Sequence, residues 1–257
     1  MRLDTRFESR VASTQDLVLR AIAAGAPEGL IVFAEFQAAG RGRAGRRWVA
    51  PTGTSLMFSL LWRPPGSSWG DETLALAAGL AVAEGIEAAG GPSVQLKWPN
   101  DCLVNGQKIA GLLVEGVVQG PMAPAGVALG VGCNVAWSGL PVACLPGPRA
   151  TALDLQGKPV DVTELALSLL IHLERRYRQW LQGGFSAMWA PWQSRMAWLG
   201  MDVEVSLPSS RLSGVLLGVA ADGTLRLEKH GVETRVAAGD LAQVREGALR
   251  LEVRGPL

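Results

Sequence analysis

The chain has 257 residues, of which 48% are hydrophobic and 18% are charged, and its formal net charge is +1. This composition excludes an intrinsically disordered chain, which would need few apolar residues and a high net charge. The balanced charge provides no global field for nucleic acid, so any basic site must be local. The length predicts one main domain with a small additional one.

Cysteine and histidine are too scarce and too scattered for a disulfide framework or a metal cluster. Cys102, Cys133 and Cys144 form no C-x-x-C spacing, and His172 is far from His230, which favours a reducing compartment. The first twelve residues contain no apolar run typical of a signal peptide, and no run of about 18 apolar residues could span a membrane. We therefore expect a soluble cytoplasmic protein that binds no membrane.

Apolar periodicity predicts the elements of the first half of the chain. In order they are a helix over 17–25, strands over 30–36 and 54–64, a helix over 71–90, a strand over 94–98, and a hairpin of strands 102–104 and 107–114. Ser13 and Thr14 precede the first helix and are typical helix caps. Asn105-Gly106 between two apolar runs is a strong hairpin signal, and it places Lys108 on the returning strand.

The second half begins with a glycine-interrupted strand over 126–135, followed by a loop over 136–160 and an amphipathic helix over 161–182. Four tryptophans in and after this helix favour core packing over a ligand cage: Trp180, Trp189, Trp192 and Trp198. After Gly200, short stretches of alternating apolar and polar residues with a turn at Asp222-Gly223 predict a small β-barrel domain.

The loop between the first two strands is the most informative segment. Four arginines, Arg41, Arg43, Arg46 and Arg47, stand within seven residues, and no acid occurs between Glu35 and Asp71. Interleaved glycines let the backbone approach a ligand closely, and arginine donors match phosphate and carboxylate groups. A solvated basic loop is the simpler interpretation of such a run taken alone.

Two nucleotide-binding motifs match this loop only in part. The spacing Gly40-x-Gly42-x-x-Gly45 matches the dinucleotide fingerprint, but no helix start follows it and no acid lies about 20 residues further on. The same loop lacks the Lys and Ser/Thr of a Walker loop. We reject both interpretations.

Two further clusters carry polar groups beside predicted strands. The first is Lys97-Trp98-Pro99-Asn100-Asp101 together with Lys108, which taken alone is an ordinary strand and turn, although such lysines could stabilise charge on an acyl phosphate. The second is 130–135, where glycines admit a flat ligand and Asn134 offers both a donor and an acceptor.

In order and spacing, GRGRAGRRW (40–48), KWPND (97–101), KIAGLLVE (108–115) and GVGCNV (130–135) closely resemble the motifs of biotin–protein ligases. The likeness runs from Ser13 to about Asn134 in motifs and to the end of the chain in layout. The chain looks like the short form, without the N-terminal winged helix-turn-helix of the repressor members, so no DNA is expected as a partner.

The resemblance implies an α/β fold. A mixed-sheet catalytic domain over 1–198, related to class II aminoacyl-tRNA synthetases, would precede an SH3-like β-barrel over 199–257. ATP and biotin would form biotinyl-5′-AMP with magnesium. The biotinyl group would then pass to a lysine of the biotin carboxyl carrier protein of acetyl-CoA carboxylase. Members of the family occur as monomers or homodimers.

The resemblance also implies residue roles. Arg43, Lys108 and Asp101 would be catalytic, with Lys108 neutralising the reacting carboxylate and phosphate, and Asp101 facing the incoming lysine or helping to place magnesium. Biotin would be bound by Ser13, Thr14, Gln15, Gln37, Arg41, Gly42, Arg43, Lys108 and Gly111. The adenylate would be bound by Arg46, Trp48, Lys97, Asn134 and Cys133. The arginine loop would order over the ligand, and no direct metal motif is present.

Three residues depart from the family pattern. Gln15 stands where Asn is usual, Ala44 where a basic residue is common, and Cys133 where a branched apolar residue is common. A lipoate–protein ligase, which also forms an acyl-adenylate on a related fold, is the nearest alternative. An RNA-binding module is a third possibility, against which the balanced charge and the lack of an aromatic stacking series argue.

Overall fold

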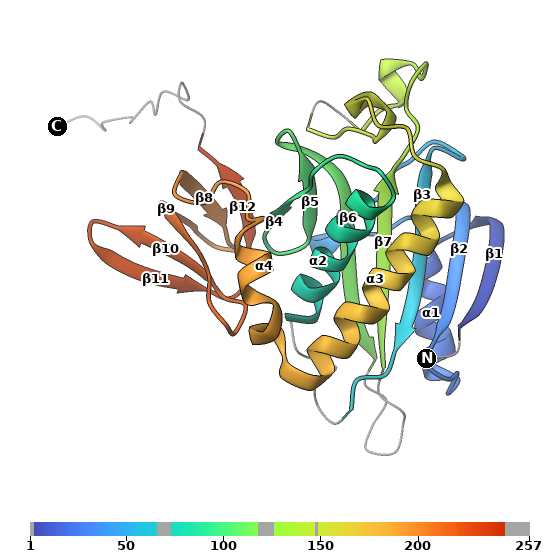
Figure 1. The fold of residues 1–257 in the computed structure, drawn as a ribbon, viewed down its shortest axis with the longest axis horizontal. Coiled ribbons are helices and arrows are strands. Elements are labelled where there is room, and N and C mark those ends of the chain that lie inside the picture. Colours follow the sequence, from blue (N-terminus) through green and yellow to red (C-terminus); the bar gives the residue numbers. More distant parts are fainter. Residues whose placement is uncertain (1–2, 66–72, 118–125, 147–148, 245–257) are drawn as a thin grey trace.

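The protein is described here by a computed structural model, which covers residues 3–65, 73–117, 126–146 and 149–244. Its centre is a seven-stranded mixed sheet with the order β1-β2-β3-β7-β6-β5-β4 (Figure 1). The strands are β1 (Asp4–Val11), β2 (Leu30–Gln37), β3 (Ser55–Trp62), β4 (Gln95–Lys97), β5 (Asp101–Val104), β6 (Gln107–Val117) and β7 (Gly126–Asn134). β1 and β2 are parallel, and every other neighbouring pair is antiparallel.

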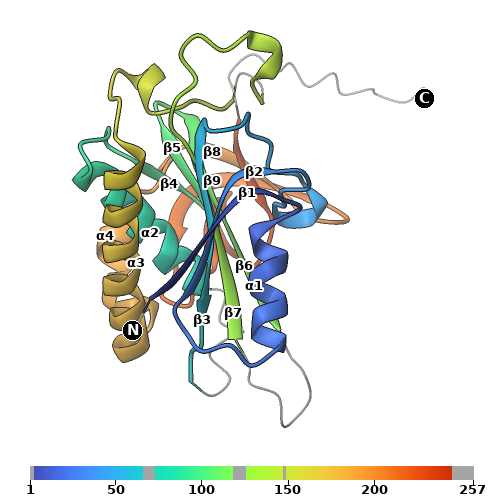
Figure 2. The ribbon, with the colours of Figure 1, turned by 90° about the vertical axis from the view of Figure 1, so that its right-hand side faces the viewer.

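Helices cover both faces of this sheet (Figure 2). α1 (Thr14–Ala23) lies on one face, and α2 (Thr73–Ala88) and α3 (Val162–Gly183) lie on the other. Because β3 is central and covered on both sides, all eight of its residues are buried. Successive side chains alternate between the faces, so Leu60 belongs to the core under α2 and α3, while Leu61 packs against α1.

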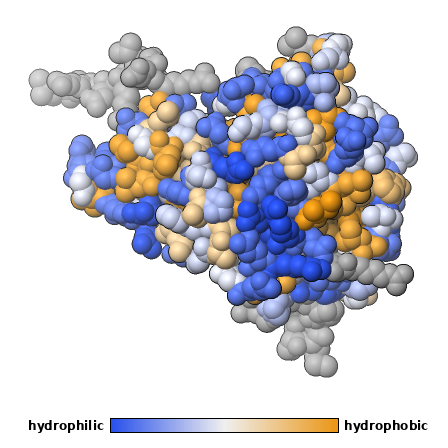
Figure 3. All heavy atoms as spheres, in the orientation of Figure 1, coloured by the Kyte–Doolittle hydropathy of each residue, from blue (hydrophilic) through white to orange (hydrophobic). Residues whose placement is uncertain are grey.

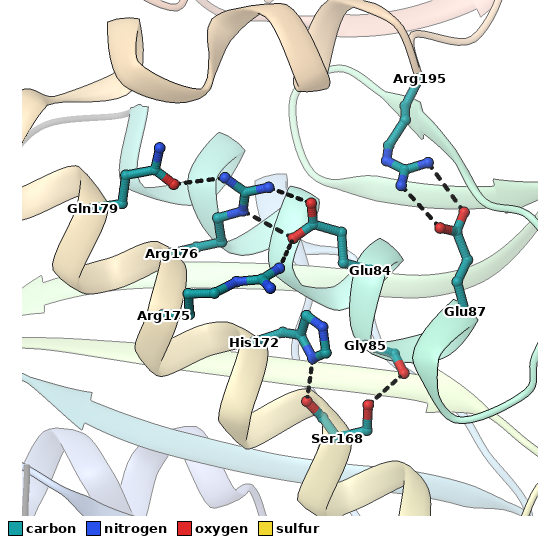
Figure 4. Close-up of polar contacts among 9 residues, drawn as sticks. All are labelled: Glu84, Gly85, Glu87, Ser168, His172, Arg175, Arg176, Gln179 and Arg195. Carbon is teal, nitrogen blue, oxygen red and sulfur yellow. Dashed lines mark hydrogen bonds and ion pairs between the residues drawn. The ribbon is translucent and has the colours of Figure 1, made fainter.

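α2 and α3, which cover the same face of the sheet, are held together by close packing at a glycine and by ion pairs. A Cβ on Gly85 would lie 2.7 Å from a methyl carbon of Leu169, so only glycine allows this spacing. Glu84 of α2 accepts hydrogen bonds from Arg175 and Arg176 of α3 (Figure 4). Burial alone would raise the pKa of the Glu84 carboxyl, but the two guanidinium groups outweigh it and the pKa is lowered.

A second sheet follows the last helices. It is antiparallel, with the order β11-β10-β9-β8-β12, and contains β8 (Asp202–Ser206), β9 (Arg211–Val219), β10 (Leu225–Lys229), β11 (Val232–Val236) and β12 (Asp240–Gln243). It packs against the central part of the protein, where Trp98 Nε1 donates to the Gly223 carbonyl at 3.0 Å. A small C-terminal β domain is therefore confirmed. Its closure into a barrel and a boundary at residue 199 stay predictions.

Most elements expected from the sequence are present within about two residues of their predicted bounds. Asn105 and Gly106 form the predicted turn, with φ of 49° and 75°, and Trp180 and Trp192 are buried in the core. Trp189 is 36% exposed and lies in α4 (Trp189–Gln193), a short helix that was not predicted. Asp71, Glu72, most of the loop before β7 and residues 245–257 lie outside the described residues.

The structure differs from the sequence prediction in two places. β1 was not predicted, because DTRFESRV carries only two apolar residues and is almost wholly exposed. Ser13 occupies the N-cap position of α1, but its side chain makes no capping hydrogen bond. Gln37 Oε1 does this instead, accepting the Thr14 N–H at 2.8 Å. No helix in the described part of the chain is long and apolar enough to cross a membrane.

Candidate functional site

A cleft opens on the α1 face of the central sheet, at the N-terminal end of α1. It brings together segments that are far apart in the sequence, because α1, the arginine loop, β3, β6 and β7 all end or pass there. Its lining residues are Ser13, Thr14, Gln15, Gln37, Arg41, Gly42, Arg43, Arg46, Arg47, Trp48, Phe58, Ser59, Asn100, Asp101, Lys108, Gly111, Leu112, Leu113, Gly130, Val131 and Gly132.

One end of the cleft is a buried polar network. Thr14 Oγ1 lies 2.8 Å from Ser59 Oγ and donates to Gln37 Oε1 at 3.2 Å. Ser59 Oγ in turn donates to Gln15 Oε1 at 2.9 Å. Gln15 Nε2 donates to the Ala128 carbonyl at 2.9 Å. The longer side chain of Gln15 therefore reaches the backbone of β7, and it fixes the position of Ser59.

Two groups of this network lack strong partners. Ser13 is 2% exposed, and its Oγ has no hydrogen-bond partner within the described residues. Among the described residues, the Gln37 side-chain nitrogen donates only to the sulfur of Met57, at 3.3 Å, and thioether sulfur is a weak acceptor. A buried hydroxyl without a partner costs roughly 1–3 kcal/mol. Both groups are thus available to a polar ligand.

Trp48 covers two glycines on neighbouring strands. A Cβ on Gly132 of β7 would lie 2.4 Å from the indole ring, and one on Gly111 of β6 would lie 3.1 Å from it. Lys108 Nζ lies 5.5 Å from the centre of the indole ring, within the range of a cation–π contact. Trp48 Nε1 is buried and has no partner in the described part of the chain. The glycines let an aromatic group lie directly on the sheet.

At the other end of the cleft, Asp101 forms ion pairs with two lysines. Its Oδ1 lies 2.5 Å from Lys108 Nζ, and its Oδ2 lies 3.3 Å from Lys97 Nζ. Burial alone would raise the pKa of the Asp101 carboxyl, but the two ammonium groups outweigh it and the pKa is lowered below its usual 3.8. The carboxylate is therefore ionised at neutral pH and fixes the position of Lys108. This lysine lies two residues after the Asn105-Gly106 turn.

This ion-pair cluster predicts an acid-sensitive contribution to stability. Because the pKa of Asp101 is lowered in the folded state, its contribution is complete above the unfolded pKa and is lost as pH falls through the folded one. We expect Asp101→Asn to lower the free energy of unfolding by about 1–3 kcal/mol near neutral pH. Urea unfolding should show this difference shrinking below about pH 4. A difference that is the same in acid would contradict the ion-pair assignment.

The arginine loop meets carboxylates that the local sequence does not contain. Arg41 Nη2 lies 3.0 Å from Asp16 Oδ1 and 2.8 Å from Glu115 Oε2. Arg46 Nη2 lies 2.5 Å from Asp240 Oδ1 of the C-terminal sheet. These partners relieve much of the repulsion expected within the loop.

Arg43 differs from these two arginines. Its Nη1 donates to Asn100 Oδ1 at 3.4 Å, and within the described residues it has no carboxylate partner. Arg47 Nη2 donates to the Ala38 carbonyl at 2.8 Å. Arg43 and Lys108 thus line the same cleft, and in the part of the chain that the structure describes an acid faces Lys108 but not Arg43.

Three predicted residues do not line the cleft. Cys133 is fully buried on the opposite face of β7, in the core under α2, and we propose no ligand contact for it. Asn134 is 2% exposed and donates to the Thr151 carbonyl at 2.9 Å. Lys97 contacts Asp101 but does not itself line the cleft.

Ser59 and Asn100 were assigned no role in the site from the sequence, whereas Gly130 and Gly132 were expected only to admit a flat ligand; all of them line the cleft. The alternation of β3 and β7 contained a signal for Ser59, Gly130 and Gly132, because small residues stand at these positions on the face of each strand that α1 covers. Asn100 had been assigned only to a turn. Its Nδ2 donates to the Leu112 carbonyl at 2.7 Å, which holds the turn against β6.

The residues present do not fit a protein-held magnesium site. The described ranges contain no cluster of three or more His, Cys, Asp or Glu side chains that could hold a metal ion. Both oxygens of Asp101 face ammonium groups. Magnesium stays an expectation attached to ATP.

Comparison with known proteins gives consistent similarities. Residues 7–134 match the family model described as the biotin/lipoate A/B protein ligase family. A biotin–[acetyl-CoA-carboxylase] ligase of Mycobacterium tuberculosis is 35% identical over 242 residues, which are 91% of this chain and 86% of that protein. A biotin–[acetyl-CoA-carboxylase] ligase of Paracoccus denitrificans is 37% identical over 203 residues, which are 76% of this chain and 82% of that protein. The Aquifex aeolicus biotin protein ligase, solved with biotin and ATP, has a TM-score of 0.80 at 27% identity and covers 94% of this chain and 99% of its own.

Proposed function

The chain belongs to the biotin–protein ligase family, and on that basis we propose that it joins biotin to ATP as biotinyl-5′-AMP and transfers the biotinyl group to a carrier lysine. The carrier would be the biotin carboxyl carrier protein of acetyl-CoA carboxylase, in keeping with the names of the two similar ligases. The cleft on the α1 face would be the active site.

One observation carries this proposal: one cleft has, at one end, a hydroxyl with no partner among the described residues, and at the other end it has cations. Ser13 Oγ and the Gln37 amide would hydrogen-bond the ureido group of biotin. Lys108 and Arg43 would face its carboxylate and the α-phosphate of ATP. A ligand with a neutral polar head and an anionic tail matches this separation of chemistry.

Lys108 would contribute most to the first step. A carboxylate that attacks the α-phosphate meets charge repulsion, which a fixed ammonium group reduces. The contact with Asp101 at 2.5 Å would hold Lys108 in place before the substrates arrive. In the second step Asp101 would face the incoming carrier lysine.

The arginine loop would retain the adenylate until transfer. Arg43 lacks a carboxylate partner in the described structure, so a phosphate would supply the missing negative charge. Trp48 would border the adenine or the acyl chain beside Gly111 and Gly132. A loop that excludes water would protect the reactive anhydride from hydrolysis. The carboxylate contacts of Arg41 and Arg46 speak against a free basic surface for RNA.

The unpartnered hydroxyl gives a test that separates binding from folding. We expect Ser13→Ala to leave thermal stability unchanged or slightly higher, because the hydroxyl has no partner to lose, and to weaken biotin binding about tenfold. Thr14→Val is the matched control, since it breaks contacts with Gln37 and Ser59 and should lower stability. Calorimetry and thermal unfolding measure the two effects. Unchanged biotin affinity in Ser13→Ala would remove Ser13 from the site.

The whole proposal is tested by calorimetry with biotin, followed by transfer of labelled biotin to a carrier domain. We expect heat on binding and ATP-dependent label on one carrier lysine. Failure to label the carrier in the presence of bound biotin and ATP would contradict the proposed transfer.

A further inference from the structure

The buried network at the Ser13 end of the cleft contains a side-chain amide whose orientation is fixed by the backbone. Gln15 Nε2 lies 2.9 Å from the Ala128 carbonyl oxygen and 3.3 Å from the Leu113 carbonyl oxygen. Carbonyl oxygens only accept hydrogen bonds, so both amide hydrogens of Gln15 point at the backbone of β6 and β7. The reverse orientation would bring oxygen atoms against each other. Gln15 Oε1 is therefore fixed as an acceptor.

This acceptor determines the direction of the next two hydrogen bonds. Ser59 has a single hydroxyl hydrogen, which it donates to Gln15 Oε1 at 2.9 Å. In its 2.8 Å contact with Thr14 Oγ1, Ser59 Oγ can then only accept. The single hydroxyl hydrogen of Thr14 is shared between Ser59 Oγ and Gln37 Oε1, which lies 3.2 Å away. Thr14 Oγ1 thus has lone pairs but no hydrogen for a ligand.

Gln37 presents the opposite polarity to the cleft. Its Oε1 also accepts the backbone N–H of Thr14 at 2.8 Å, which turns its amide nitrogen away from α1. Among the described residues, that nitrogen donates only to the sulfur of Met57. This end of the cleft therefore offers an acceptor at Thr14 and a donor at Gln37. A ligand in which an N–H stands beside a C=O matches both groups, whereas the dithiolane ring of lipoate matches neither.

The length of the Gln15 side chain is accommodated by a glycine on β7. A Cβ on Gly130 would lie 2.7 Å from Gln15 Oε1, so a larger residue there would displace the amide. Gln15, Ser59 and Thr14 are all buried. Solvent cannot compensate for a mismatched hydrogen bond in such a place, so the polarity of this network is costly to violate.

From these contacts we propose that Gln15 is a positioning residue that makes the cleft specific for a ureido group, acting through Ser59 and Thr14. Held by β6 and β7, its amide directs the Ser59 hydroxyl, and Ser59 in turn directs the Thr14 hydroxyl. Thr14 Oγ1 then accepts a ureido N–H, while Gln37 Nε2 donates to the ureido oxygen. This inference rests on the proposed function, because it concerns the group of biotin that the network selects.

A ligand of reversed polarity tests the direction of these hydrogen bonds. In a cyclic-carbamate analogue of biotin, a ring oxygen replaces one ureido N–H, and two isomers cover the two nitrogen positions. In calorimetry, we expect the wild-type protein to bind one isomer about a hundredfold more weakly than biotin, because its ring oxygen faces the lone pairs of Thr14. In Gln15→Met the Ser59 hydroxyl is free to donate to Thr14, and Thr14 can donate to the ligand. The affinity ratio of biotin to this isomer should therefore fall about tenfold.

Gln193→Met provides the matched control. Gln193 Nε2 donates to the Leu217 carbonyl at 3.3 Å, and its Oε1 accepts the Val219 N–H at 3.1 Å, so this change also removes amide contacts with a strand. Gln193 ends α4, on the side of the molecule turned to the viewer in Figure 3, whereas α1 lies behind the central sheet in that view. Gln193→Met should keep the wild-type affinity ratio.

Ser59→Ala interrupts the same series of hydrogen bonds from another strand. It should also lower the affinity ratio, and it keeps the test decisive if circular dichroism shows that Gln15→Met does not fold. A purely structural role of Gln15 would weaken biotin and the analogue equally. A ratio that stays at the wild-type value in the folded variants of Gln15 and Ser59, or that falls equally in Gln193→Met, would overturn the inference while leaving biotin binding by the wild type intact. A wild-type protein that binds no biotin would overturn the proposed function as well.

Discussion

Replacing Lys108 by alanine is expected to reduce the rate of biotin-dependent pyrophosphate release about a hundredfold or more, while the fold persists. The reason is electrostatic: Lys108 lines the cleft and is held 2.5 Å from Asp101, so its charge is in place where the carboxylate and the α-phosphate would react. Removal of one preorganised charge-stabilising group typically costs about 100- to 1,000-fold in rate. Steady-state pyrophosphate release at saturating biotin and ATP measures the loss.

Lys97 offers a matched control for this experiment. It also contacts Asp101, at 3.3 Å, but it does not line the cleft. Lys97→Ala should therefore perturb the carboxylate and the local stability with a much smaller loss of rate. Equal losses in the two variants would indicate that both act only through Asp101, and an unchanged rate in Lys108→Ala would remove Lys108 from the mechanism.

Arg43→Gly is expected to release biotinyl-AMP about ten- to a hundredfold faster, and the free adenylate should label bystander lysines. The estimate follows from the value of a charge-assisted hydrogen bond, about 1.5–3 kcal/mol. Arg43 is suited to this role because, in the described residues, no carboxylate competes for it. Release of labelled adenylate in a filter assay and label on an unrelated protein measure the two effects.

Arg47→Gly provides the comparison within the same loop. It removes the same charge and introduces the same backbone freedom, but Arg47 already donates to the Ala38 carbonyl. Wild-type retention in Arg43→Gly, or the same release from both variants, would show that Arg43 has no specific hold on the adenylate.

The sequence predicted those parts of the molecule whose cause is local. The Asn105-Gly106 turn, the stop of α1 before Pro27 and the amphipathic face of α3 depend on neighbouring residues, and they formed as expected. β1 is different, because its partner β2 lies about 26 residues later and its own residues are exposed. Nothing in its periodicity distinguishes it from a solvated segment, so only the finished sheet reveals it.

The candidate site divides in the same way. The motif residues Lys108, Asp101 and Arg43 were predicted and lie around one cleft. The carboxylates that meet Arg41 and Arg46 come from distant segments, so the residues around the loop do not indicate them. The family resemblance placed Cys133 near the adenylate, but adjacent residues of a strand face opposite sides of the sheet, and Cys133 lies in the core under α2.

Activation of biotin with ATP in this cleft is the step on which the rest of the proposed function depends. Biotin-dependent exchange of labelled pyrophosphate into ATP tests it most directly, because exchange requires reversible formation of the acyl-adenylate. We expect exchange with biotin, none with lipoate at the same concentration, and loss of exchange in Lys108→Ala. Exchange that depends on lipoate, or no exchange with either acid, would contradict it.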